Sequence, residues 1–103
     1  MGGLDLVRAD LAARIAMLDG RAVHARPADL ASDIDAIRVI AHRAGLNPAV
    51  TVAHFLDSAL ARGECGVLLH GWLAVLADAV RSERQDLPAC EVFAAACSVR
   101  LAS

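Results

Sequence analysis

Apolar residues recur three and four positions apart through most of the chain, a spacing that places them along one face of an α-helix. No stretch alternates apolar and polar residues as a half-buried strand does. We therefore expect an all-α fold, a compact bundle of four to five short helices with no β-sheet. The expected helices span residues 4–19, from 27 or 32 to 45, 47–63, 67 to about 84, and 86 to about 101.

Residues that favour helix ends separate these segments. Gly20, Gly45 and Gly63 are placed to end the first three helices, because glycine readily adopts the left-handed conformation that terminates many helices. Asn47 followed by Pro48 predicts the start of the third helix, with the asparagine as its N-cap.

The fourth segment has the broadest apolar surface. One of its faces consists of residues at helical spacing, namely Leu69, Trp72, Leu73, Leu76 and Val80. Leu68 and Val75 widen this face, so we expect the fourth helix to be central in the bundle. In the last helix, the residues expected to face inward are Val92, Phe93, Ala96 and Val99.

The length and composition fit one small domain over residues 1–103. The chain has 103 residues, of which 57% are hydrophobic and 3% aromatic. Alanine supplies much of the apolar fraction, and alanine is the strongest helix former. This composition favours closely packed helices with one hydrophobic core.

The charges and the cysteines indicate which binding partners and which cellular compartment to expect. Ten basic residues, all arginine, are interleaved with twelve acidic ones, and the net charge is −2. This balance lacks the basic face that nucleic-acid binding needs. The most apolar stretch, residues 67–80, is too short for a bilayer, so we expect no membrane interaction. Three cysteines without a secretory segment predict reduced thiols in a cytoplasmic protein.

No motif in the sequence predicts a catalytic or metal site. The four histidines are His24, His42, His54 and His70, and the cysteines are Cys65, Cys90 and Cys97. None of them shows the paired spacing of a zinc site. A cysteine–histidine pair could be assembled from Cys65 or Cys90, but the sequence does not indicate which histidine would be near. We therefore expect a protein that is not an enzyme and that uses no cofactor.

Residues 40–45, with the sequence Ile-Ala-His-Arg-Ala-Gly, resemble the phosphate-accepting segment of histidine-containing phosphotransfer domains. Those domains are helical bundles of this size, and residues 55–63 resemble their next helix. The resemblance implies that His42 is an exposed phosphoacceptor. In that family the helix continues for turns beyond the histidine, whereas here Gly45 and Pro48 follow closely.

Two functions are consistent with these observations. The first is a protein-interaction or regulatory module that binds a protein partner or self-associates, for example as a homodimer, because the broad apolar faces exceed what a short chain buries alone. The candidate interface or pocket residues are His70, Trp72, Leu68 and Val75. The alternative is phosphotransfer through His42.

Overall fold

The computed structural model of the chain describes residues 3–64 and 66–102, and all of their regular structure is helical. The helices are α1 (Gly3–Arg21), α2 (Pro27–Ala44), α3 (Asn47–Ala61), α4 (Val67–Arg81) and α5 (Leu87–Ala102). These described residues contain no strand, so the predicted all-α bundle of four to five short helices is confirmed.

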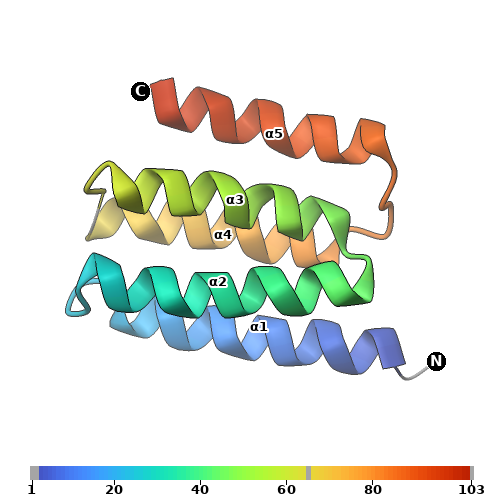
Figure 1. Cartoon of the computed structure of the whole chain (residues 1–103), viewed down its shortest axis with the longest axis horizontal. Coiled ribbons are helices and arrows are strands. Elements are labelled where there is room, and N and C mark those ends of the chain that lie inside the picture. The colour runs from blue at the N-terminus through green and yellow to red at the C-terminus, as the bar shows by residue number, and fades with distance from the viewer. Residues whose placement is uncertain (1–2, 65, 103) are drawn as a thin grey trace.

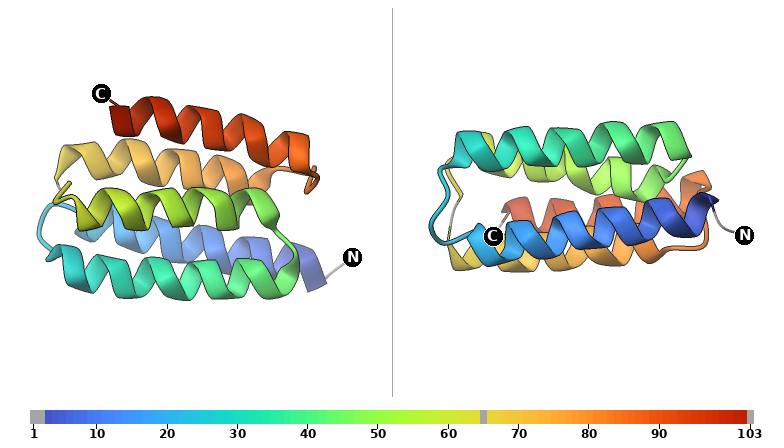
Figure 2. Two further views of the ribbon diagram at one scale, coloured as in Figure 1. Left: turned by 45° about the horizontal axis from the view of Figure 1, so that its top comes forward. Right: turned by 90° about the horizontal axis from the view of Figure 1, so that it is seen from below.

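Helices α1 to α4 form an antiparallel four-helix bundle (Figure 1). Each of these helices packs against two of the others, α1 and α3 both lying beside α2 and α4, and the four enclose a shared core. Helix α5 lies outside the bundle, packed on α3 and running antiparallel to the neighbouring α4 (Figure 2). The fold therefore consists of an inner bundle and one added outer helix.

Two glycines end helices as the sequence predicts. Gly45 is left-handed, with φ of 74°, and its N–H donates to the carbonyl of His42 over 3.1 Å. The next residue, Leu46, donates to the carbonyl of Ala41 over 2.9 Å, which completes a Schellman motif. Gly63, with φ of 90°, follows α3 with the same pattern of bonds. The short turns bring consecutive helices side by side.

Two predicted helix ends are wrong. Gly20 does not end the first helix, because α1 continues through it to Arg21. Asn47 is already in α3, and its side-chain amide donates to the carbonyl of Gln85 over 3.0 Å, so it is not the N-cap. In this position Asn47 joins the α2–α3 corner to the α4–α5 connection, a long-range contact that sequence spacing does not reveal.

Helix α4 ends earlier than predicted, at Arg81, and α1 supplies partners for carbonyl groups at this end. Nε of Arg8 donates to the carbonyl of Val80 over 3.1 Å, and its Nη2 donates to that of Ser82 over 3.0 Å. The final turn of a helix has carbonyls without intrahelical partners. A single arginine from the first helix therefore caps the fourth.

The helix with most neighbours is α3, so the prediction that the fourth helix is central is wrong. α3 packs against α2, α4 and α5, whereas α4 packs chiefly against α1 and α3. The predicted face of α4 is buried, but Leu68, which widens it, is 58% exposed. The buried Ala49, Ala53 and Ala59 let neighbouring helices approach α3 closely. A helix can therefore be central in this fold because it has small side chains, even where another helix has a broader apolar face.

Helix α5 packs with a different stripe from the predicted one. The stripe that faces α3 is spaced by four and consists of Ala89, Phe93 and Cys97, with Ala89 and Cys97 buried and Phe93 partly buried. Of the predicted inward residues only Phe93 faces in, while Val92, Ala96 and Val99 are exposed. Because α5 is apolar on both sides, periodicity alone does not distinguish its inner stripe from its outer one.

Candidate interaction surface

An exposed apolar surface runs along the side of α5 that points away from α3. We call it the outer face, and its residues are Pro88, Val92, Ala95, Ala96, Val99 and Ala102. The side chains of Val92 and Val99 are 68% and 69% exposed, and Leu87 at the start of the helix is 70% exposed. Single exposed apolar residues are ordinary, but a continuous series on successive turns is typical of an interaction surface.

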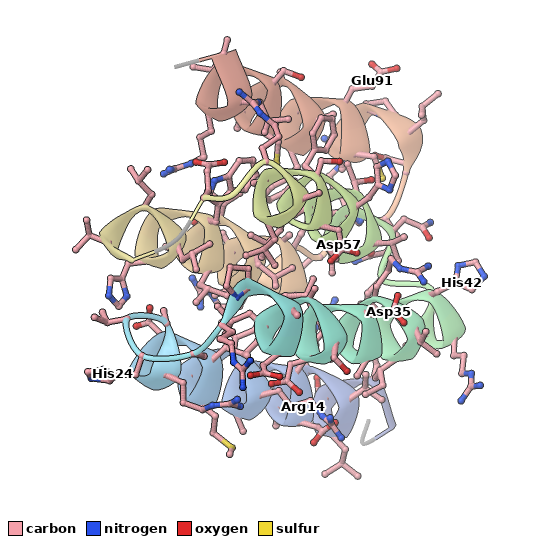
Figure 3. The ribbon with its side chains drawn as sticks, turned by 60° about the vertical axis from the view of Figure 1, so that its left-hand side comes forward. Arg14, His24, Asp35, His42, Asp57 and Glu91 are labelled. Atoms are coloured by element: carbon pink, nitrogen blue, oxygen red, sulfur yellow. The ribbon has the colours of Figure 1, made fainter. Side chains whose placement is uncertain are left out.

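Few charges interrupt the outer face. Among the sixteen residues of α5, only Glu91 and Arg100 carry a charge. Glu91 points away from the protein at one edge of the face (Figure 3). Arg100 turns toward α4, where its guanidinium lies 6.0 Å from the ring centroid of Trp72. A helix that is apolar all round is normally buried, so the outer face is the part of α5 that this chain leaves exposed to water.

Both ends of α5 are fixed to the rest of the protein. Just before its start, the side-chain amide of Asn47 on α3 donates to the carbonyl of Gln85 over 3.0 Å. The helix itself is capped by Oδ1 of Asp86, which accepts a hydrogen bond from the N–H of Ala89 over 3.0 Å. At its end, Nη1 of Arg62 donates to the carbonyl of Leu101 over 2.9 Å. The hydrogen bond from the Ala89 N–H lowers the pKa of the Asp86 carboxyl below its ordinary value, and a hydrogen bond from the Arg84 side chain contributes a smaller lowering. The outer face is therefore presented by a helix that is anchored at both ends.

The guanidinium of Arg100 lies against Gly71 of α4. A Cβ atom at Gly71 would lie 2.6 Å from Nη1 of Arg100, so only glycine leaves room for the guanidinium in this position. The indole N–H of Trp72 donates to Oε1 of Glu64 over 3.4 Å. A pocket between α4 and the end of α5 is lined by Glu64, Leu68, Trp72 and Arg100. In this position beside Trp72, the charge of Arg100 lies to one side of the outer face.

The predicted interface residues on α4 fall into two separate places. Leu68 and Trp72 line the pocket beside α5, and Val75 is partly buried one turn further along the same side. Trp72 is only 1% exposed, so its ring serves mainly as core. His70 faces the opposite way, toward α1, where its Nδ1 pairs with the carboxylate of Asp19. The fold does not bring His70 together with the other three.

His42, the phosphoacceptor implied by the family resemblance, is exposed in the last turn of α2 and points away from the bundle (Figure 3). Its exposure matches what phosphotransfer requires. Its position does not match the family pattern, because α2 ends at Ala44 and the histidine is not flanked by further helical turns.

The remaining histidines and the described cysteines lie in separate surroundings with no hydrogen bond between them. His24 is exposed in the α1–α2 connection, and the ring of His54 stands edge-on to that of Phe55 with centroids 6.2 Å apart. Cys90 is partly buried and Cys97 is buried, and neither thiol is hydrogen-bonded to a histidine within the described residues. Burial raises the pKa of the Cys97 thiol. Cys65, the other candidate nucleophile, lies outside the described residues.

Asp57 is the most unusual carboxylate of the α2–α3 surface. It lies between the two helices (Figure 3), and one of its oxygens is buried without a hydrogen-bond partner. Burial, with a smaller contribution from Asp35, raises the pKa of the Asp57 carboxyl, while Arg38 opposes this shift. Arg38 itself is bonded to Asp35, with its Nη2 2.6 Å from Oδ1. This cluster is charged but supplies only two carboxylates.

Two further features are absent from the described residues, a cluster of metal ligands and a membrane-spanning helix. Nowhere in residues 3–64 and 66–102 do three or more histidine, cysteine or acidic side chains come together as metal ligands would. None of the helices in these residues combines the length and the apolar character needed to cross a membrane.

Comparison with known proteins identifies no relative: no family model, no curated protein and no solved structure matches this chain. The functional interpretation therefore depends on the surface itself.

The sequence interpretation missed the outer face because it assigned three of its residues, Val92, Ala96 and Val99, to the core. The signal was present in the composition of α5, which has too many apolar residues for one buried stripe and too few charges for a solvated face. Four of the predicted site residues lie on α4, whereas the most continuous exposed apolar surface that we describe lies on the next helix.

Proposed function

We propose that this protein is a small interaction module that binds a protein partner through the outer face of α5. The observation that carries the proposal is the exposure of Val92 and Val99, close to 70% each, on a helix that is nearly free of charge and is tied to α3 at its end and, through Gln85, just before its start. A rigid apolar helix face is suited to packing against a helix of another protein, whose apolar residues would be spaced in the same way.

The role that we propose is binding rather than catalysis. The core of the described residues is apolar, with no buried polar or charged residue among them. We also propose a cytoplasmic location, which the free thiols of Cys90 and Cys97 support because reducing compartments keep such groups unpaired.

Site-specific photo-crosslinking in living cells tests this function. A photoreactive amino acid replaces Val92 in one strain and Met17 in another, because Met17 is 67% exposed on α1 and serves as a matched control. We expect a discrete crosslinked adduct from position 92 and none from position 17. Adducts of equal yield from both positions, or none from position 92, would contradict the proposal.

The second candidate function is phosphotransfer through His42, and the exposure of that side chain favours it. An exposed imidazole can accept a phosphoryl group, because its neutral ring nitrogen is a nucleophile. The N–P bond would form as the donor's bond from phosphorus to its leaving oxygen breaks, so that acetyl phosphate would release acetate. The arginine that follows it, Arg43, would lie close enough in sequence to offer a positive charge to the phosphate.

Incubation with acetyl phosphate as the donor tests this second function. We expect an acid-labile phosphate on the wild-type chain and its loss in His42→Gln, with His24→Gln as the control because His24 is also exposed. Labelling that survives in His42→Gln, or that never forms on the wild type, rules out this role.

A further inference from the structure

We propose that the partner of the outer face is a second copy of this chain, bound so that the two α5 helices are antiparallel and related by a two-fold axis between Ala95 and Ala96. This inference rests on the proposed function, since it uses the same surface. It adds the identity of the partner and the orientation in which it binds.

The order of residues on the outer face is complementary to itself. Val92 comes three residues before Ala95, and Val99 comes three residues after Ala96. An antiparallel pair centred between the alanines therefore places Val92 of each copy opposite Val99 of the other. A two-fold dimer requires this property, because the same patch must serve as both halves of the interface.

The sizes of the side chains suit such a pair. The two valines are seven residues apart, which is about 10.5 Å along the helix, so the dimer would contain two valine pairs separated by that distance. Ala95 and Ala96 lie between them at the centre, where small side chains allow two helix backbones to approach closely. The outer face has no large side chain at its centre that would hold the helices apart.

The charges favour the antiparallel orientation over the parallel one. In a parallel pair, Glu91 of one copy would lie beside Glu91 of the other, and these like charges would repel. In the antiparallel pair, the two Glu91 side chains are separated by about nine residues, or roughly 13.5 Å along the axis, which exceeds the screening length of about 8 Å at physiological salt. Antiparallel alignment also opposes the two helix dipoles favourably.

The size of the surface predicts a weak, reversible dimer. A helix of sixteen residues is about 24 Å long and about 10 Å wide, which gives a contact of roughly 250 Å² for each copy. Stable interfaces cover about 800 Å² on each partner. We therefore expect association that depends strongly on concentration.

Sedimentation velocity of the purified chain from about 10 µM to about 1 mM, the range in which an interface this small would associate, tests the identity of the partner. We expect the average mass of the wild type to rise toward twice the monomer mass. Val92→Glu should remain monomeric across the range, because it would place a charge in the contact. Met17→Glu, the matched control on α1, should behave as the wild type does.

Thiol crosslinking tests the orientation. Val92→Cys and Val99→Cys are each made in a Cys65→Ala, Cys90→Ala background, and a short thiol-reactive crosslinker is added to each variant alone and to their mixture. We expect at least a several-fold higher yield of dimer in the mixture, because only the mixture brings positions 92 and 99 together. A higher yield from each variant alone would indicate a parallel pair and overturn the antiparallel arrangement.

A wild type that stays monomeric at about 1 mM, the upper end of the range for so small a contact, would overturn the self-association. If position 92 nevertheless crosslinks to a different protein in cells, the proposed function stands and only the identity of the partner is wrong. If neither occurs, both proposals fail.

Discussion

The inner bundle and the outer helix α5 are built from similar residues but use them differently. In the bundle the apolar faces close on one another, and Leu11, Ile37 and Leu76 are completely buried. On α5 only Cys97 is completely buried and Ala89 is 8% exposed, although the helix has apolar residues around most of its circumference. The four helices of the bundle bury their apolar faces against one another, whereas α5 leaves one apolar face exposed to solvent.

Because of this difference, we expect the stability of the fold and the binding of a partner to depend on different residues. Residues of the bundle core should determine whether the chain folds, because each buried side chain is removed from water by others of the same chain. Residues of the outer face should determine only what the folded chain binds. Substitutions in the two regions therefore test whether folding and binding depend on separate residues.

The largest effect is expected in the bundle. Leu56 is 1% exposed on α3, which packs against three other helices. Leu56→Ala should lower the free energy of unfolding by about 2–5 kcal/mol, because it removes buried apolar atoms and leaves a cavity. Denaturation with urea measures this change. A loss below about 0.5 kcal/mol, typical of surface positions, would show that α3 is not central.

A smaller effect is expected from the inner stripe of α5. Cys97 is completely buried against the bundle, and Cys97→Ser would place a hydroxyl there at a cost of about 1–3 kcal/mol. Hydrogen exchange should become faster in α5 while the amides of α1 and α2 keep their protection. Equal loss of protection throughout would mean that α5 is not a separable layer.

The N-cap of α5 should make that helix sensitive to acid. The pKa of Asp86 is lowered in the folded state, so the stabilisation by its carboxylate is present above the unfolded pKa and is lost as the pH falls through the folded pKa. The protection of the α5 amides, meaning their exchange rate relative to the intrinsic rate at the same pH, should therefore decrease as the pH falls below about 5. Asp86→Asn should keep a neutral cap and remove this dependence, and a pH response identical to that of the wild type would exclude the mechanism.

The smallest effect on folding is expected on the outer face. Val99→Lys should leave the free energy of unfolding of the monomer within about 0.5 kcal/mol, because the side chain is 69% exposed. The same substitution should abolish association, since it introduces a charge into the contact. Thermal unfolding of a dilute sample separates the two effects, and a strongly destabilised monomer would place Val99 in the core after all.

The sequence predicted the helices better than it predicted their neighbours. Gly45 and Gly63 end helices because a left-handed glycine is a local requirement, which spacing reveals. The cap of α4 by Arg8 and the bond from Asn47 to Gln85 join residues far apart in the chain, so no local pattern indicates them. The same limit explains the error on α5.

The candidate site was predicted less well than the fold. Leu68 and Trp72 line one pocket on α4, whereas His70, predicted with them, pairs with Asp19 on another side of the helix. Val92 and Val99 were assigned to the interior because two apolar stripes on one helix have the same period. Only the position of α3 determines which stripe is covered.

The most direct test of the role of the outer face is the concentration dependence of backbone amide chemical shifts in solution. As the chain is concentrated to about 1 mM, which a contact of this size requires, the amides of Val92, Ala95 and Val99 should shift while those along α1 and α2 stay unchanged. Shifts confined to the bundle, or no shifts anywhere while partner crosslinking from position 92 is also absent, would contradict the assignment of α5 as the binding helix.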